Sequence, residues 1–174
     1  MWRYVIAGFF LVSVVTGAQP PKAGSPLRAL LLQELRETHN EKNWFVSENE
    51  AVAGLKPEQA AWSDGKNHSV GQLVQHLSYW NAANLAKFSH QSARQVANND
   101  ETFNFDPKQW ETALKEFDQT MGALEQTVQS ADEGTLEKIA PTIARIAQHN
   151  AYHIGEMVTS RKKQGSWNPE TGVK

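Results

Sequence analysis

The chain has 174 residues with 17 basic and 19 acidic side chains, which gives a formal net charge of −2. This length supports one domain with a substantial core, and the charge balance excludes the strongly basic surface that nucleic-acid binding requires. The chain has no cysteine, so disulfides, thiolate catalysis and cysteine metal ligands are also excluded.

The first 18 residues have the three-part pattern of a secretory signal peptide. Arg3 precedes an apolar run of about 12 residues, and small residues follow up to Ala18. A membrane-spanning helix needs about 18 apolar residues or more, so an uncleaved anchor is the weaker interpretation. We therefore expect residues 1–18 to be removed, residues 19–25 to form a linker, and the mature protein to be periplasmic or secreted without a stable membrane span.

A first helix is predicted directly after the linker. Ser25 can cap it and Pro26 suits its first turn, because proline lacks the N–H that would be unpaired there. Leucines follow at helical spacing at positions 27, 31 and 35. We expect this helix to continue to about Ala53, where Gly54 ends it.

Residues 68–88 predict a second helix. Ser69 and Gln72 have the spacing of a capping box, and apolar side chains then recur at helical spacing as far as Phe88. The polar segment 89–105 has no helical periodicity. It is long enough to lead the chain back along the length of a bundle.

Two further helices are predicted in the C-terminal half. Asp106 and Pro107 repeat the start signal, and apolar residues alternate at three-four spacing from 110 to 128. Residues 130–141 are expected to interrupt the pattern, and a fourth helix is expected from about Pro141 to Gly165. These features predict an all-α four-helix bundle over residues 26–168, followed by a C-terminal tail at 169–174.

His149 and His153 lie four residues apart in the segment HNAYH, so both imidazoles project from one face of the predicted fourth helix. Such a pair also arises by chance, so a third ligand is needed. His76 lies at the edge of the apolar stripe of the second helix, as the pair does on the fourth. Alone it would be interpreted as a surface or interface histidine. Together the three imidazoles can bind a divalent ion and leave one coordination position open for water or substrate.

Two segments also resemble a known family. HSVGQLVQHLSYWN, at 68–81, and RIAQHNAYHIGEMVTSRKKQGSW, at 145–167, resemble the second and fourth helices of the DinB-like superfamily, also called DinB/YfiT-like metalloenzymes. The resemblance assigns the metal ligands to His76, His149 and His153. It implies an up-down-down-up bundle that binds one divalent ion, zinc or nickel. Members include thiol-dependent transferases, an isomerase and proteins described only as hydrolases, and they are often homodimers.

The resulting hypothesis is a metal-dependent hydrolase that acts on a small-molecule substrate. One alternative is a metal-dependent thiol S-transferase, although the leader directs the chain away from the cytoplasm, where low-molecular-weight thiols are abundant. A second alternative is a metal- or partner-binding bundle without turnover. No cofactor other than a metal ion has support in the sequence.

Glu156, one turn beyond His153, is a candidate for orienting that imidazole or assisting proton transfer. A solvated helix glutamate is the alternative interpretation. Asn150 occupies the position that holds the catalytic glutamate in H-E-x-x-H metalloproteases, which excludes that family.

The residues after His76 and the remaining histidines complete the candidates. Tyr79, Trp80 and Asn81 follow His76 and could line a pocket. For Trp80, packing in the core is the favoured interpretation. Of the other histidines, we expect His39 and His90 on the surface and His68 at the start of the second helix.

Overall fold

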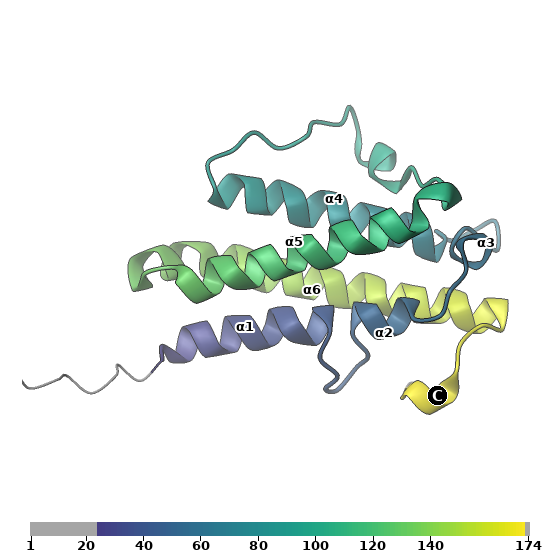
Figure 1. The fold of residues 1–174 in the computed structure, drawn as a ribbon, viewed down its shortest axis with the longest axis horizontal. Helices are drawn as coiled ribbons and strands as arrows, with labels where there is room; N and C mark the ends of the chain where they lie inside the picture. Colours follow the sequence, from purple (N-terminus) through teal and green to yellow (C-terminus); the bar gives the residue numbers. More distant parts are fainter. Residues whose placement is uncertain (1–23, 173–174) are drawn as a thin grey trace, which may run out of the picture.

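The computed structural model describes residues 24–172, and within this range all regular structure is helical, with no strand. Four long helices pack together (Figure 1). Their bounds are α1 (Pro26–His39), α4 (Val70–Phe88), α5 (Trp110–Ser130) and α6 (Glu133–Gln164). In Figure 1, α1 and α6 run in one direction and α4 and α5 in the other, so the directions in chain order are up, down, down, up.

Short elements connect the long helices. Between α1 and α4 lie α2 (Glu48–Val52) and α3 (Pro57–Ala60). The crossover from α4 to α5 contains η1 (Asn99–Phe103) and η2 (Pro107–Gln109), and η3 (Pro169–Thr171) follows α6. Both α1 and α4 pack against α5 and α6, so the core lies between the four long helices.

Several predicted helix ends are confirmed. The Ser69 side chain accepts a hydrogen bond from the backbone N–H of Gln72, and the Gln72 side chain accepts one from the backbone N–H of Ser69. Gly165 ends α6 with φ +79°, a left-handed conformation that favours glycine. These contacts pair backbone groups that a helix end leaves without an intrahelical partner.

The predicted first helix is wrong in its second half. It ends at His39, a loop follows, and the shorter helix α2 begins at Glu48. The Ser47 side chain accepts a hydrogen bond from the backbone N–H of Glu50, which starts a new helix instead of continuing the first.

The predicted start of the fourth helix is also wrong, because α6 begins at Glu133 rather than at Pro141. The Asp132 side chain caps it by accepting hydrogen bonds from the N–H and the hydroxyl of Thr135, at 2.9 and 2.8 Å. Pro141 lies inside the helix and removes one backbone donor. The turns before it are retained, with Leu136 fully buried in the core.

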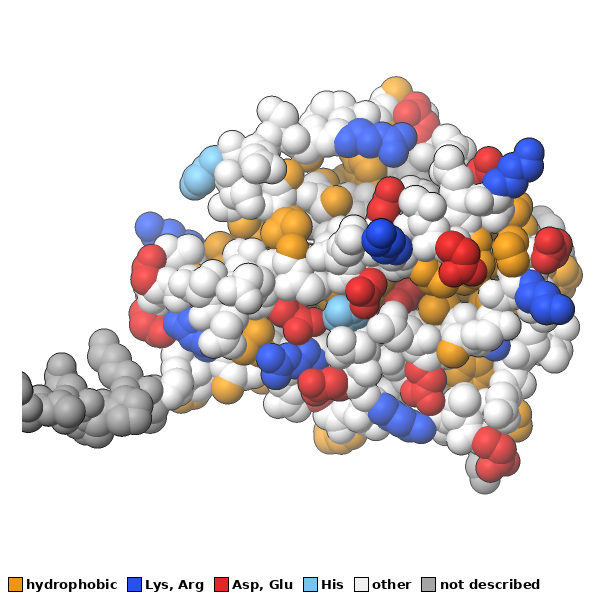
Figure 2. All heavy atoms as spheres, in the orientation of Figure 1, with side chains coloured by type: hydrophobic (Ala, Val, Ile, Leu, Met, Phe, Trp, Pro, Cys, Tyr) orange, Lys and Arg blue, Asp and Glu red, His pale blue; other side chains and the backbone are white. Residues whose placement is uncertain are grey.

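Apolar side chains from all four long helices form the core. The largest fully buried ones include Leu35 of α1, Leu77 of α4, Phe117 of α5 and Ile154 of α6. Within the described range, no helix has the length and apolarity needed to cross a membrane. Figure 2 shows acidic and basic side chains mixed over one face of the molecule. The proposed signal peptide and most of the linker lie outside the described residues.

His39 was predicted on the surface, and this prediction is wrong. Its side chain is 5% exposed, and its ring nitrogens Nδ1 and Nε2 lie 2.8 Å from Glu125 and 2.9 Å from Asp118. The two carboxylates come from α5, so this histidine connects the end of α1 to α5.

Glu48, the first residue of α2, is buried with a side-chain oxygen that has no hydrogen-bond partner. Burial, together with the negative charge of Asp118, raises the pKa of Glu48 from the ordinary 4.5 to about 8. The unfolded chain releases this proton near pH 4.5, whereas the folded chain keeps it to about pH 8. The unfolded state therefore binds fewer protons in this interval, and Glu48 lowers stability as the pH rises through it.

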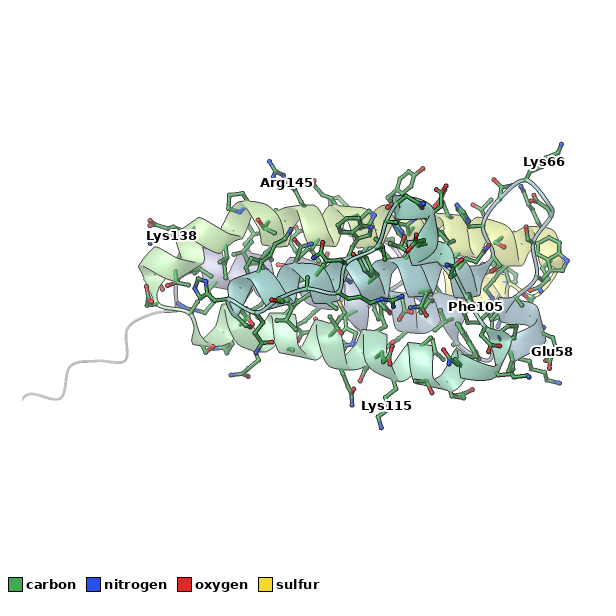
Figure 3. The ribbon with its side chains drawn as sticks, turned by 90° about the horizontal axis from the view of Figure 1, so that it is seen from above. Glu58, Lys66, Phe105, Lys115, Lys138 and Arg145 are labelled. Carbon is green, nitrogen blue, oxygen red and sulfur yellow. The ribbon has the colours of Figure 1, made fainter. Side chains whose placement is uncertain are left out.

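We predict that Glu48→Gln raises the free energy of unfolding at pH 8 relative to the wild type and changes it less at pH 5. Urea unfolding at both pH values measures the difference. Glu58→Gln is the matched control, because Glu58 is exposed on α3 (Figure 3). An equal rise in the free energy of unfolding of Glu48→Gln at pH 5 and pH 8 would contradict the pH dependence assigned to Glu48.

Candidate metal centre

The three predicted histidines meet at the contact between α4 and α6. His76 projects from α4, and His149 and His153 project from successive turns of α6. The Nε2 atom of His149 lies 3.3 Å from Nε2 of His76 and 3.0 Å from Nε2 of His153. His76 and His153 are buried and His149 is half-buried. The cluster therefore presents three nitrogen atoms to one small volume.

These distances fit a single divalent ion. Two nitrogens bound to one tetrahedral ion at about 2.0–2.1 Å lie about 3.3 Å apart, close to the separations of the Nε2 atoms. Ligand atoms from the three rings all lie within 4.8 Å of one another. The side chains could hold an ion with small adjustments.

Hydrogen bonds at Nδ1 determine which ring nitrogen of His76 and of His153 carries the lone pair. The Thr102 hydroxyl lies 2.6 Å from Nδ1 of His76 and donates its hydrogen to the backbone oxygen of Asn99. It can therefore only accept from His76, so Nδ1 carries the hydrogen and Nε2 the lone pair. A carboxylate oxygen of Glu156 lies 2.6 Å from Nδ1 of His153 and has the same effect.

Aromatic rings hold His76 in place. Its ring stacks on Phe103 with centroids 4.1 Å apart and an interplanar angle of 8°, and Phe103 stacks on His68 at 3.8 Å and 4°. Phe103 and Thr102 both belong to η1. The crossover therefore contacts the His76 ring both through its face and through Nδ1.

Electrostatics favour the neutral imidazole, which is the form that binds metal. Burial, followed by the nearby charges of His153, His149 and His68, lowers the pKa of His76 to about 3. Burial and His153 also lower the pKa of His149. Both rings therefore have an unprotonated nitrogen at neutral pH.

Close contacts with α4 position the crossover. A Cβ atom on Gly71 would lie 2.2 Å from the ring of Phe105, so this residue must be glycine for the ring to pack there (Figure 3). The indole N–H of Trp80 donates to the side-chain oxygen of Asn99. Phe105 lies just after η1, and Asn99 is the first residue of η1. The two contacts therefore hold both ends of η1 against α4 and help to set the position of Thr102.

A buried amide pair lies next to the cluster. The side-chain N–H of Asn81 donates to the side-chain oxygen of Asn150 at 3.1 Å, and both amides lie 3.4 Å from the sulfur of Met121. The side-chain oxygen of Asn81 has no partner among the described residues. The pair links α4 to α6 near the histidines, and so it helps to set their register.

Two cavities adjoin the cluster. One of about 540 Å³ is lined by His76 and His149, and one of about 270 Å³ is lined by Glu156 and His68. Asn81 lines the larger cavity, as the sequence suggested that it could, and so does Trp80, for which core packing was favoured, whereas Tyr79 lines a different cavity under the crossover.

Thr102, Phe103 and the role of Asn150 were not predicted from the sequence. Thr102 and Phe103 had no signal, because they lie in the polar crossover far along the chain from the histidines. Asn150 did have one: it lies between Ile143 and Ile154 on the apolar stripe of α6, and a polar residue there requires a buried partner.

The fold and the site define a class of protein, an up-down-down-up helical bundle with a three-histidine cluster at a helix contact that could hold a divalent ion. Residues 49–157, more than half of the chain, match the family model described as the DinB superfamily. The chain therefore belongs to the DinB superfamily. No curated protein and no solved structure gives a significant match to it.

We predict that Thr102→Val weakens zinc binding by about 10–100-fold, the usual effect of losing a hydrogen bond that orients a metal-binding histidine. Competition with a chromophoric chelator measures the affinity. Thr127→Val is the matched control, because the Thr127 hydroxyl bonds only a helix carbonyl on α5. Thr102→Ser should restore binding, and equal affinities for all four proteins would contradict the role of this hydroxyl.

Proposed function

We propose that this protein is a metal-dependent hydrolase that holds one divalent ion, zinc or nickel, on His76, His149 and His153. The observation that carries the proposal is the convergence of three Nε2 atoms while Nδ1 of two rings is bonded to Thr102 and Glu156. Imidazole ligands suit zinc and nickel, whereas magnesium and calcium prefer oxygen.

The number of ligands supports catalysis over a structural role. Structural zinc sites are closed by four protein ligands, whereas catalytic sites have three. The cluster contains three histidines among the described residues. When bound, the ion supplies Lewis acidity that polarises a carbonyl or phosphoryl group toward hydrolysis.

Residues around the cluster supply the remaining functions. Thr102 and Glu156 orient two ligand rings, and Phe103 excludes water from one face of His76. The Glu156 side chain is 43% exposed and lines the 270 Å³ cavity, so its carboxylate can accept a proton from a molecule bound there. A carboxylate base in this position suits hydrolysis, because activation of a water molecule releases a proton that the carboxylate can accept.

Metal content tests the proposal directly. Purified protein exposed to zinc or nickel should retain about one ion per chain by mass spectrometry, and His153→Ala should lose most of it because only two ligands remain. His90→Asn is the control, since it removes an exposed imidazole at a positive φ that asparagine tolerates. If the wild type stays metal-free, the metal proposal is wrong.

The metal-loaded protein should then hydrolyse members of an ester and amide panel, and His153→Ala should not. A parallel assay for conjugation of thiols separates hydrolase from transferase. Thiol conjugation without hydrolysis would replace the hydrolase assignment, and inactivity in both assays with metal bound would favour a binding protein.

We also propose that the protein is exported, a proposal supported by the sequence of residues 1–18 alone. Full-length protein expressed in bacteria should be found outside the cytoplasm with Gln19 at its N-terminus, as measured by fractionation and intact mass. A variant that begins at Gln19 after an initiator methionine should stay inside the cell. Full-length product in the cytoplasm would contradict the proposal.

A further inference from the structure

The larger cavity is a groove along the contact between α4 and α6. It has a volume of about 540 Å³ and begins at His76 and His149. The two helices run in opposite directions, so the groove extends toward the C-terminal end of α4 and the N-terminal half of α6. Its far end is lined by Lys87 and Thr142.

The groove extends over several turns of α4. His76 and Lys87 are eleven positions apart on this helix, which corresponds to about 16 Å at a rise of 1.5 Å per residue. Arg145 lies one turn before His149, about 6 Å along α6. A molecule whose reacting group meets the histidines therefore reaches Lys87 only if it is extended, whereas Arg145 lies part of the way along the groove.

The charged residues of the groove are all basic. Besides the histidines, its charged lining consists of Lys87 and Arg145, and no carboxylate lines it. Among residues 24–172, neither side chain forms an ion pair. Figure 3 shows Arg145 extended into solvent from α6, so its guanidinium lies at the edge of the groove and not inside it. Neutral histidine ligands also leave the charge of a bound ion uncompensated.

The floor of the groove has one unused hydrogen-bond acceptor. Asn81 is 1% exposed and lines the groove, and its side-chain oxygen has no hydrogen-bond partner within residues 24–172. A buried oxygen of this kind is costly unless something donates to it. The oxygen is itself buried, so Asn81 forms part of the floor of the groove without offering this oxygen to a bound molecule.

The smaller cavity has a different character. It is lined by Asp64 and Glu156, and its one basic residue, Lys163, is paired with Asp64 at 2.8 Å. An anion is repelled there and attracted to the groove between α4 and α6.

We propose that the ligand of this groove is an elongated organic anion, with its reacting group at the histidine cluster, a negatively charged group near Lys87 at the far end, and Arg145 at the edge of the groove between them. This inference rests on the proposed function, because the ion held by the histidines anchors the reacting end. It adds the substrate class, which the cluster alone does not specify.

Isothermal titration calorimetry of zinc-loaded protein with malonate, succinate, adipate and suberate tests the groove. Affinity should rise with the length of the dicarboxylate, and the corresponding neutral diols should bind much more weakly. Replacing Lys87 and Arg145 together by glutamine should weaken suberate binding about tenfold and remove the dependence on length. Lys138→Gln and Lys115→Gln are the controls, because these lysines lie outside the groove (Figure 3).

Metal content, measured on the same samples, separates this inference from the proposed function. Zinc retained without a preference for longer dianions, or equal effects of the groove and control variants, would overturn the groove proposal alone. Absence of bound zinc, with suberate binding that still depends on Lys87 and Arg145, would overturn the metal proposal alone. If the protein retains no zinc and does not bind suberate through Lys87 and Arg145, both the metal proposal and the groove proposal are overturned.

Discussion

Two hydrogen bonds at Nδ1 determine what the histidine cluster can do. Thr102 accepts from His76, and Glu156 accepts from His153, so both rings direct a lone pair from Nε2 toward His149. Without these partners either ring could place its hydrogen on Nε2, and the cluster would lose a ligand atom. The rest of the site depends on placing these two acceptors correctly. Glu156 achieves this locally, one turn from its partner on the same helix, whereas Thr102 depends on the tertiary structure.

The crossover connects the topology of the bundle to the chemistry of the site. Because α4 and α5 run in the same direction, the chain must return along the whole bundle between them (Figure 1). On this return, η1 packs against α4 with Phe103 against His76, and Phe105, which follows η1, packs against Gly71. The segment that the helix order requires thus also supplies the acceptor for His76. Its contacts are nonlocal, so the oriented cluster forms only after the crossover has packed against α4.

The sequence predicted the local features of the fold and of the site. Helical periodicity and capping residues identified the four long helices, and the flank of two apolar stripes identified all three histidines, because both are properties of single helices. The break after His39 was missed because the cap at Ser47 starts a separate helix despite the apolar spacing, and the early start of α6 was missed because Pro141 suggested a first turn although it lies inside the helix. The burial of His39 and the contact of Thr102 with His76, 26 residues away, depend on packing between elements and leave no periodic signal.

The histidine cluster does not stabilise the fold by itself. Nε2 of His149 can donate at most one hydrogen, so without a cation at least one of the neighbouring lone pairs stays unpaired in a largely buried space. The Asn81 oxygen beside it is also unpaired. Leucine at these positions would fill the contact between α4 and α6 without unpaired groups, as it does elsewhere in the core. Three histidine nitrogens that face one another within a small volume are what a cation site requires. A cation on the histidines relieves the repulsion between their lone pairs, and its binding free energy then stabilises the folded state.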